Sequence, residues 1–198
     1  MPMVAQHFFL FLIWVLYFFI HSFFASLSVK RFFSNNWFIH RNYRILYNLI
    51  AVISLVPVLY YQFNSPSIAL YKTSFLSNVA AAFLILVGAC VIVICLRKYF
   101  LMHIGVGPAG RESNELLKEG IHKYVRHPLY TGTLIFLFGI LLIFPSSTNL
   151  LAYITLAVYT VAGTILEEQK LRAEYGEVYV RYSKEVPRFI PHLKKSYK

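Results

Sequence analysis

The chain has 198 residues, of which 58% are hydrophobic and 14% are charged. A soluble domain carries roughly 25% charged residues, so this composition excludes an ordinary soluble domain, and the length favours a single domain. The net charge of +11 could suggest a nucleic-acid binder, but the basic residues lie between apolar stretches instead of gathering on one folded face. They indicate contact with the anionic lipid surface of a membrane, and we expect no nucleic-acid partner.

Five stretches of the sequence contain no Lys, Arg, Asp or Glu. A helix needs about 20 apolar residues to cross a bilayer, and the first three stretches are long enough. The last two are shorter, and the segment between them, 145–149, contains the turn residues Pro and Asn. The pattern predicts an all-α integral membrane protein with about five transmembrane helices, the last two forming a short hairpin. The five stretches are 5–27, 45–63, 75–96, 129–144 and 150–166.

Basic residues are distributed unevenly over the connections between these spans. They occur between spans one and two, between spans three and four, and after span five, and Lys72 is the only one of the 19 that falls elsewhere. Because cytoplasmic connections carry the excess of Lys and Arg, the sequence predicts an outside N-terminus and a cytoplasmic C-terminus. We expect one membrane domain over 1–198, in which 1–96 supplies three spans and 97–198 forms the ligand-binding core with the cytoplasmic segments.

The approach to the fourth span has the features of an anion site. Pro128 suits the first turn of a helix, where its missing N–H costs nothing. Arg126 and His127 then lie at the helix N-terminus, where unbonded N–H groups, the helix dipole and a guanidinium all favour an anion. A plain basic flank before an ordinary helix would have the same sequence.

The exit from the fifth span carries two adjacent carboxylates, Glu167 and Glu168. They are expected at the end of the helix, where the dipole favours cations, so their position indicates a site for hydroxyls or a cation. A solvated helix end that pairs with Lys170 and Arg172 is the alternative. Since the two spans form a hairpin, both sites should lie close together. S-adenosylmethionine has the required polarity, with a carboxylate, ribose hydroxyls and a sulfonium, although other zwitterionic or nucleotide ligands would fit as well.

The run 125–132, Val-Arg-His-Pro-Leu-Tyr-Thr-Gly, together with Glu167 and Glu168, resembles the Arg-His-Pro-x-Tyr-x-Gly and Glu-Glu signature of integral-membrane methyltransferases. These are the isoprenylcysteine carboxyl methyltransferases and phospholipid methyltransferases. The resemblance covers about 118–191 and implies a helical fold with a cytoplasm-facing S-adenosylmethionine pocket, while His122 departs from the aromatic usual there. It implies cofactor binding by Arg126, His127, Tyr130, Glu167 and Glu168. The tail residues that share it are Leu171, Tyr175, Gly176, Tyr179, Tyr182 and 186–191.

The N-terminal half resembles a branch that includes methanethiol S-methyltransferases and a denitrification-associated membrane protein. This resemblance favours a small or lipophilic thiol as the methyl acceptor. We expect His21 to act on the acceptor and Arg172 to orient it, as the catalytic residues, although a histidine in a span more often bonds a neighbouring helix and Arg172 could contact a lipid headgroup. The residues that carry this resemblance are His21, Ser22, Ala25, Lys30, Tyr43, Arg44 and Tyr47.

Other functions fit parts of the pattern. An isoprenylcysteine-type carboxyl O-methyltransferase needs the same cofactor, and an NADPH-dependent membrane reductase is an alternative because sterol reductases share parts of the helical architecture. A transporter usually needs charged residues within its spans, and a non-enzymatic assembly factor would leave both motifs without a role. The segment 105–110 has Gly-x-Gly-x-x-Gly spacing, but no strand precedes it and Pro108 interrupts it, so it predicts a loop. Cys90 and Cys95 match no metal site.

Overall fold

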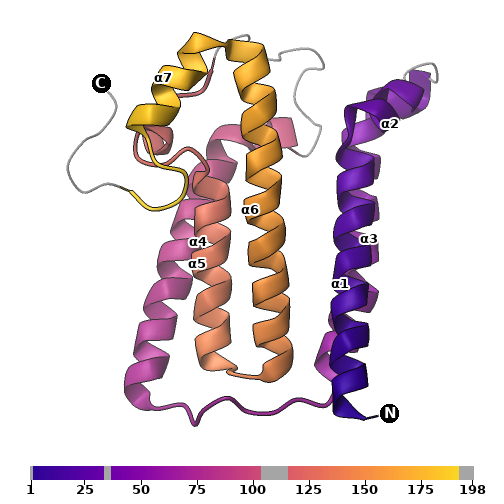
Figure 1. The fold of residues 1–198 in the computed structure, drawn as a ribbon, viewed down its shortest axis with the longest axis vertical. Coiled ribbons are helices and arrows are strands. Elements are labelled where there is room, and N and C mark those ends of the chain that lie inside the picture. Colours follow the sequence, from indigo (N-terminus) through magenta and orange to yellow (C-terminus); the bar gives the residue numbers. More distant parts are fainter. Residues whose placement is uncertain (1, 34–36, 104–115, 192–198) are drawn as a thin grey trace. The chain divides into compact units, whose positions relative to one another are not determined.

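The computed structural model describes residues 2–33, 37–103 and 116–191, so the segment 105–110 lies outside the described residues. Within these ranges the chain is helical, apart from turns and one isolated bridge between Ala69 and Ser146 (Figure 1). This confirms the predicted all-α fold. The elements are α1 (Met3–Ala25), α2 (Leu27–Phe32), α3 (Trp37–Asn64), α4 (Phe75–His103), the 3-10 helix η2 (Gly120–Lys123), α5 (Pro128–Ile143), α6 (Ser147–Tyr175) and α7 (Glu177–Glu185).

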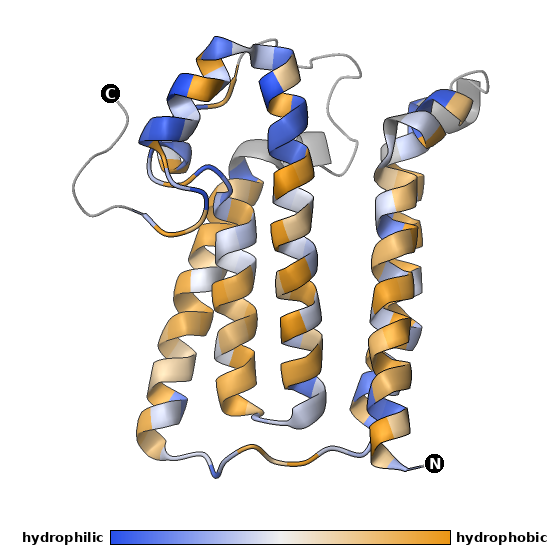
Figure 2. Ribbon diagram, in the orientation of Figure 1, coloured by the Kyte–Doolittle hydropathy of each residue, from blue (hydrophilic) through white to orange (hydrophobic). Residues whose placement is uncertain are grey.

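Four of the described helices, α1, α3, α4 and α6, are long and apolar enough to cross a membrane. The fifth apolar helix, α5, has 16 residues, which gives a length of about 24 Å at 1.5 Å per residue. Figure 2 shows apolar residues along these helices and polar residues at the C-terminal end of α6 and in α7. The described residues therefore contain the expected number of candidate spans. Of the two helices that were expected to be short, α5 is short and α6 is not.

Helix α6 continues well beyond the apolar stretch that predicted it and ends at Tyr175. The additional turns of α6 are stabilised because Leu171 and Tyr175, one turn apart, pack against a buried cluster that includes Tyr179. Gly176, at φ 53°, then ends the helix. The expectation that Glu167 and Glu168 end a helix is therefore wrong, and the unfavourable dipole inferred for them does not arise.

The contacts divide the chain into two units. The first unit contains α1, α2, α3 and the first turns of α6. In it, Trp14 donates from Nε1 to Gln62 Oε1 at 3.1 Å, and Gln62 donates from Nε2 to Asn149 Oδ1 at 2.9 Å. Hydrogen bonds of this kind satisfy polar groups between helices that are otherwise apolar.

Both histidines of α1 take part in similar contacts within the first unit. His7 Nε2 lies 2.9 Å from Ser147 Oγ, and His21 Nε2 lies 2.8 Å from the hydroxyl of Tyr47. The expectation that a histidine in this span bonds a neighbouring helix is confirmed.

The second unit contains most of α4, η2, α5, the rest of α6 and α7. The helices α4 and α5 approach each other closely at glycines. A Cβ atom added at Gly88 would lie 2.6 Å from the backbone nitrogen of Phe136 and 2.7 Å from the carbonyl oxygen of Gly132. The close approach therefore depends on the absence of a side chain at Gly88.

Beyond α6, the chain folds back and forms a small core of its own. Tyr179, Tyr182 and Val186 are buried together, and the hydroxyl of Tyr182 donates to the carbonyl oxygen of His122 at 2.8 Å. This core fixes α7 against η2, and it carries the following residues, 187–189, to the start of α5.

Candidate functional site

The N-terminus of α5 is bonded to the segment that follows α7. The backbone nitrogen of Arg126 donates to the carbonyl oxygen of Pro187 at 2.9 Å, and that of His127 donates to the carbonyl oxygen of Arg188 at 3.2 Å. The hydroxyl of Thr131 donates to the carbonyl oxygen of Phe189 at 3.1 Å. Pro128 begins the helix, as predicted. The backbone N–H groups of Arg126 and His127 are thus used within the protein.

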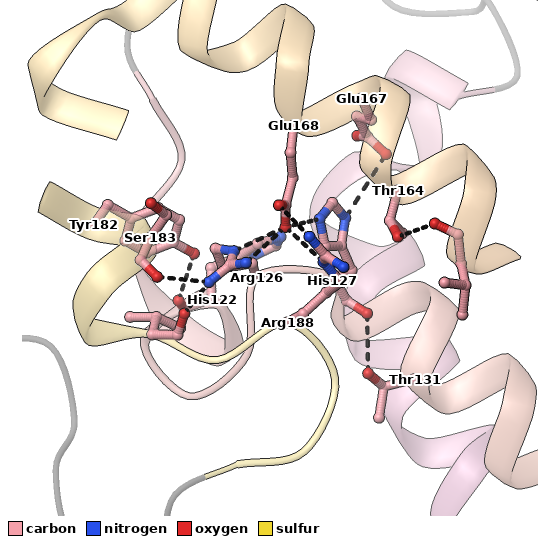
Figure 3. A network of polar contacts seen from close by, with 12 residues as sticks. His122, Arg126, His127, Thr131, Thr164, Glu167, Glu168, Tyr182, Ser183 and Arg188 are labelled. Atoms are coloured by element: carbon pink, nitrogen blue, oxygen red, sulfur yellow. Dashed lines mark hydrogen bonds and ion pairs between the residues drawn. The ribbon is translucent and has the colours of Figure 1, made fainter. Parts of the chain in front are cut away.

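Glu168 lies at the centre of the polar network that these elements enclose (Figure 3). Its Oε1 atom accepts hydrogen bonds from Nε and Nη2 of Arg126 at 3.0 and 2.8 Å, from Nε of Arg188 at 3.0 Å and from Nε2 of His127 at 3.1 Å. Its Oε2 atom accepts one from Nη2 of Arg188 at 2.7 Å. The side chain is 3% exposed. A carboxylate buried to this degree requires such partners, since moving a charge from water into the protein interior without them costs several kcal/mol.

The guanidinium of Arg126 has a second role. Its Nη1 atom donates to the carbonyl oxygen of Ser183 at 2.8 Å and to that of Val186. These carbonyls lie at the C-terminal end of α7, where a cation is favoured. Arg126 thus joins α6, α7 and the start of α5, and most of its donors are used in doing so. The prediction that it binds the cofactor remains a prediction.

Burial and contact with Glu168 both shift the pKa values of the groups around this carboxylate. Burial lowers the pKa of His127 from its usual 6.5, although the two neighbouring carboxylates oppose this. The hydrogen bonds to Glu168 raise the pKa of Arg188. Burial, reinforced by the charge of Glu168, raises the pKa of Tyr179 to about 12. At neutral pH the imidazole is therefore neutral, whereas the guanidinium of Arg188 is charged.

Glu167 has a different environment from its neighbour in the sequence. Its side chain is 46% exposed, and its Oε2 atom lies 3.7 Å from Nδ1 of His127. The imidazole of His127 stacks on the ring of Tyr130, with centroids 5.8 Å apart and planes inclined by 27°, and Phe189 lies 6.2 Å away. The carboxylate of Glu167 and the ring of Tyr130 therefore lie on the accessible side of the network, and the ring of His127 is buried beside them.

The structure brings together the two motifs that the hairpin was expected to join. Arg126, His127, Glu167 and Glu168 form one network, and Tyr130 lies beside it. Of the two residues predicted to be catalytic, Arg172 is exposed on α6, one turn after Glu168, and His21 belongs to the first unit.

Arg188 was not predicted as a site residue, although it contributes two hydrogen bonds to Glu168. It belongs to the tail pattern 186–191 that resembles the membrane methyltransferases, so its position was marked in the sequence. Nothing in the spacing of that pattern indicated that Arg188 returns to Glu168.

Comparison with curated proteins gives partial matches. The chain is 35% identical to a methanethiol S-methyltransferase of Pseudomonas deceptionensis over 78 residues, which cover 38% of this chain and 28% of that protein. It is 31% identical to protein-S-isoprenylcysteine O-methyltransferase B of Arabidopsis thaliana over 83 residues, 41% of this chain and 42% of that protein. It is 36% identical to a methanethiol S-methyltransferase of Crocosphaera subtropica over 74 residues, 37% of this chain and 28% of that protein.

The matches therefore span less than half of the length of each of these relatives. No solved structure matches the chain significantly. A model of one protein family, described as NnrU protein, matches residues 9–192. Since this match covers nearly the whole sequence, the chain belongs to the NnrU protein family.

Proposed function

We propose that the chain is a membrane methyltransferase that uses S-adenosylmethionine. The observation that carries the proposal is the folding of two motifs, 41 residues apart in the sequence, into one network around Glu168. The relatives that the chain resembles are named as methyltransferases, which supports the same reaction class. The membrane-spanning helices support a site at the edge of a bilayer.

The residues on the accessible side of the network suit this cofactor. S-adenosylmethionine carries its methyl group on a sulfonium, which makes that group ready for transfer. An aromatic face and a carboxylate both stabilise a sulfonium, and the ring of Tyr130 and the carboxylate of Glu167 provide one of each. Glu167 can also accept hydrogen bonds from the hydroxyls or the ammonium group. The task of the protein is then to align donor and acceptor and to exclude water.

We further propose that the acceptor is a small or lipophilic thiol that enters from the membrane. Two of the relatives are named methanethiol S-methyltransferases, which supports a thiol. The thiol of cysteine has a pKa of about 8.5, and an apolar pocket raises the pKa of a thiol, so a base or a cation must favour the thiolate. We assign this role to His21, whose ring contacts the hydroxyl of Tyr47, and the orientation of the acceptor to Arg172.

A carboxylate acceptor is the second candidate, because one relative is named a protein-S-isoprenylcysteine O-methyltransferase. A carboxylate is already ionised at neutral pH and needs no base. The two candidates therefore differ in their dependence on His21.

The test is methyl transfer by the purified protein in detergent, with labelled S-adenosylmethionine and three acceptors: methanethiol, a longer alkylthiol and a prenylated cysteine. Loss of a general base slows a reaction by about 100-fold or more, so His21→Ala should slow thiol methylation to that extent. The matched control is His7→Ala, which removes the other histidine of α1 and should retain the wild-type rate.

Three results would contradict parts of the proposal. Methylation of the prenylated cysteine alone, at a rate that His21→Ala leaves unchanged, would replace the thiol with a carboxylate. Binding of NADPH and not of S-adenosylmethionine, measured by calorimetry, would replace the methyltransferase with a reductase. Binding of neither would favour a non-enzymatic assembly factor.

A further inference from the structure

The short helix α2 follows α1 at a change of direction (Figure 1). Ser26, between the two helices, has an extended backbone, with φ −70° and ψ 145°. Its hydroxyl accepts a hydrogen bond from the backbone nitrogen of Val29 at 3.4 Å, and a serine in this role is a preferred start for a helix. The spanning helix α1 therefore ends here, and α2 runs from its end in a new direction.

Contacts with α3 fix the direction of α2. The hydroxyl of Tyr43 donates to the carbonyl oxygen of Phe24 at 2.6 Å, and the carbonyls in the last turn of a helix have no partner within that helix. The ring of Tyr43 also lies 6.4 Å from the ring of Phe33, which directly follows α2. The residues on both sides of α2 are thus attached to the beginning of α3, and all three helices belong to the first unit.

The side chains of α2 divide into an apolar side and a basic side. Adjacent residues on a helix point about 100° apart, so residues two positions apart point in nearly opposite directions. Lys30 is therefore opposite Phe32, and Arg31 is opposite Val29. The side chain of Phe32 is 79% exposed, and that of Arg31 is exposed as well. An apolar side with an aromatic ring and a basic side opposite it are typical of helices that lie in the plane of a membrane interface.

The positive charge around α2 is not balanced by carboxylates of its own unit. Arg41, near the beginning of α3, is also exposed, and none of the eight acidic residues of the chain falls in the sequence of the first unit. Anionic phospholipid headgroups attract basic residues beside a span, and aromatic rings are favoured at the level of the headgroups. A soluble acidic partner would neutralise the basic side but would leave the ring of Phe32 in water.

We propose that α2 lies in the bilayer interface and binds anionic phospholipids, with Phe32 among the upper acyl chains and with Lys30 and Arg31 on the phosphates. The sequence indicated lipid contact for the basic residues as a whole, and this proposal places a specific site on one short helix of fixed direction. The site belongs to the first unit and does not depend on the proposed methyl transfer.

The experiment measures how brominated lipids quench tryptophan fluorescence, with the full chain in phosphatidylcholine vesicles that contain a minor share of phosphatidylglycerol. Bromine is placed on the acyl chains of the phosphatidylglycerol in one sample and on an equal amount of phosphatidylcholine in the other. Phe32→Trp should be quenched more strongly by the brominated phosphatidylglycerol. Phe63→Trp is the matched control, because Phe63, at the end of α3, is 75% exposed, and both lipids should quench it equally. Wild type, with its two tryptophans, gives the background.

Two double substitutions test the basic side in the Phe32→Trp background. Each basic residue near an anionic surface contributes roughly fivefold in affinity, so Lys30→Gln with Arg31→Gln should reduce the preference for phosphatidylglycerol about tenfold or more. Arg181→Gln with Lys184→Gln removes the same charge from exposed positions of α7 and should leave the preference unchanged. High salt should weaken the preference, because it screens exposed charges.

Equal quenching of Phe32→Trp by the two brominated lipids would overturn the proposal. A preference that inorganic phosphate abolishes at matched ionic strength would also overturn it, because the ligand would then be a free phosphate. A lower melting temperature of the variant with Lys30→Gln and Arg31→Gln in neutral detergent without lipid would show that the two cations pair with a carboxylate elsewhere in the chain, and the lipid site would be wrong.

Discussion

Tyr179 combines deep burial with a hydroxyl that makes no hydrogen bond of ordinary geometry to the described residues, although the guanidinium of Arg126 lies near it. The side chain is 1% exposed. Burial and the charge of Glu168 raise its pKa to about 12, compared with about 10 for tyrosine in an unfolded chain. The folded state thus retains the phenolic proton over a range in which the unfolded state loses it.

Tyr179→Phe should therefore change how stability depends on pH. Between about pH 10 and pH 12 the unfolded wild-type chain binds fewer protons at this position than the folded one, so the free energy of unfolding falls as the pH rises. The variant lacks this contribution. The stability difference between wild type and variant, measured in detergent from pH 8 to pH 11, should shift in favour of the variant above pH 10.

Below pH 10 the variant should be at least as stable as the wild type, because a buried hydroxyl without a partner costs about 1 kcal/mol or more. A loss of more than about 1 kcal/mol at pH 8 would mean that the hydroxyl has a partner, and the pH argument would fail with it.

At this scale the sequence predicted which residues gather but not how they divide their roles. The hairpin was enough to bring Glu168 near Arg126 and His127. Adjacent residues on a helix point about 100° apart, so Glu167 and Glu168 cannot both point into the centre of the network, and Glu167 lies at its exposed edge. Which of the two points into the centre depends on the return of Arg188 from beyond α7, and no local pattern encodes that return.

The crossing of α4 and α5 depends on backbone contact at Gly88. Gly88→Ala would place a Cβ atom 2.6 Å from the backbone nitrogen of Phe136, and neither helix can yield without shifting its axis. Over-packing of this kind costs about 1–3 kcal/mol. We expect a clear loss of thermal stability in detergent.

Gly163→Ala is the matched control, because a Cβ atom at Gly163, in α6, would meet nothing within 4 Å. Alanine is favoured over glycine inside a helix by about 0.5–1 kcal/mol, so this variant should be as stable as wild type or more stable. Equal effects of the two substitutions would show that the crossing does not depend on Gly88.

The charge-free stretches predicted four of the helix starts to within a few residues, since charges are excluded from the hydrocarbon. They did not predict the end of α6, because the last turns of that helix are stabilised by packing. Leu171 and Tyr175 face the buried core around Tyr179, and the polar residues between them are tolerated on the opposite face. The core was not predicted, so neither was the extension.

For the whole molecule, the contact between His127 and Glu168 argues that α5 crosses the bilayer despite its length. From Ser147 to Glu168, α6 rises by about 32 Å at 1.5 Å per residue. The start of α5 bonds to Glu168, and a short link joins its end to the start of α6. The segment from His127 to Ser147, which is α5 with the links at its two ends, therefore covers the same distance as α6 does from Ser147 to Glu168, and this distance is close to the thickness of the hydrocarbon.

With α4, α5 and α6 all crossing, the link before α4 and the helix α7 must lie on opposite sides. We expect the link to be outside and α7 cytoplasmic, since Lys72 is the only basic residue on the outer side of the predicted topology. Thr73→Cys and Lys184→Cys are suitable labels, because both positions are exposed, in a background that lacks Cys90 and Cys95.

An impermeant thiol reagent should label Thr73→Cys in intact cells and Lys184→Cys only after permeabilisation. Labelling of both in intact cells would mean that α5 does not cross. The reverse of the expected pattern would invert the topology and place the network around Glu168 outside the cell.

The hydrogen bonds of Glu168 cannot all form at the same stage of synthesis, because Arg188 is made after Glu168. Arg188 follows Glu168 by 20 residues, and chains are made at about 5–20 residues per second, so about one to four seconds separate their synthesis. During that interval the last turns of α6 and the helix α7 are made, and the carboxylate of Glu168 has only Arg126 and His127 as partners. Each new molecule therefore passes through a brief period in which the hairpin is made but its central charge still lacks its second guanidinium, and this period ends only when the segment after α7 arrives.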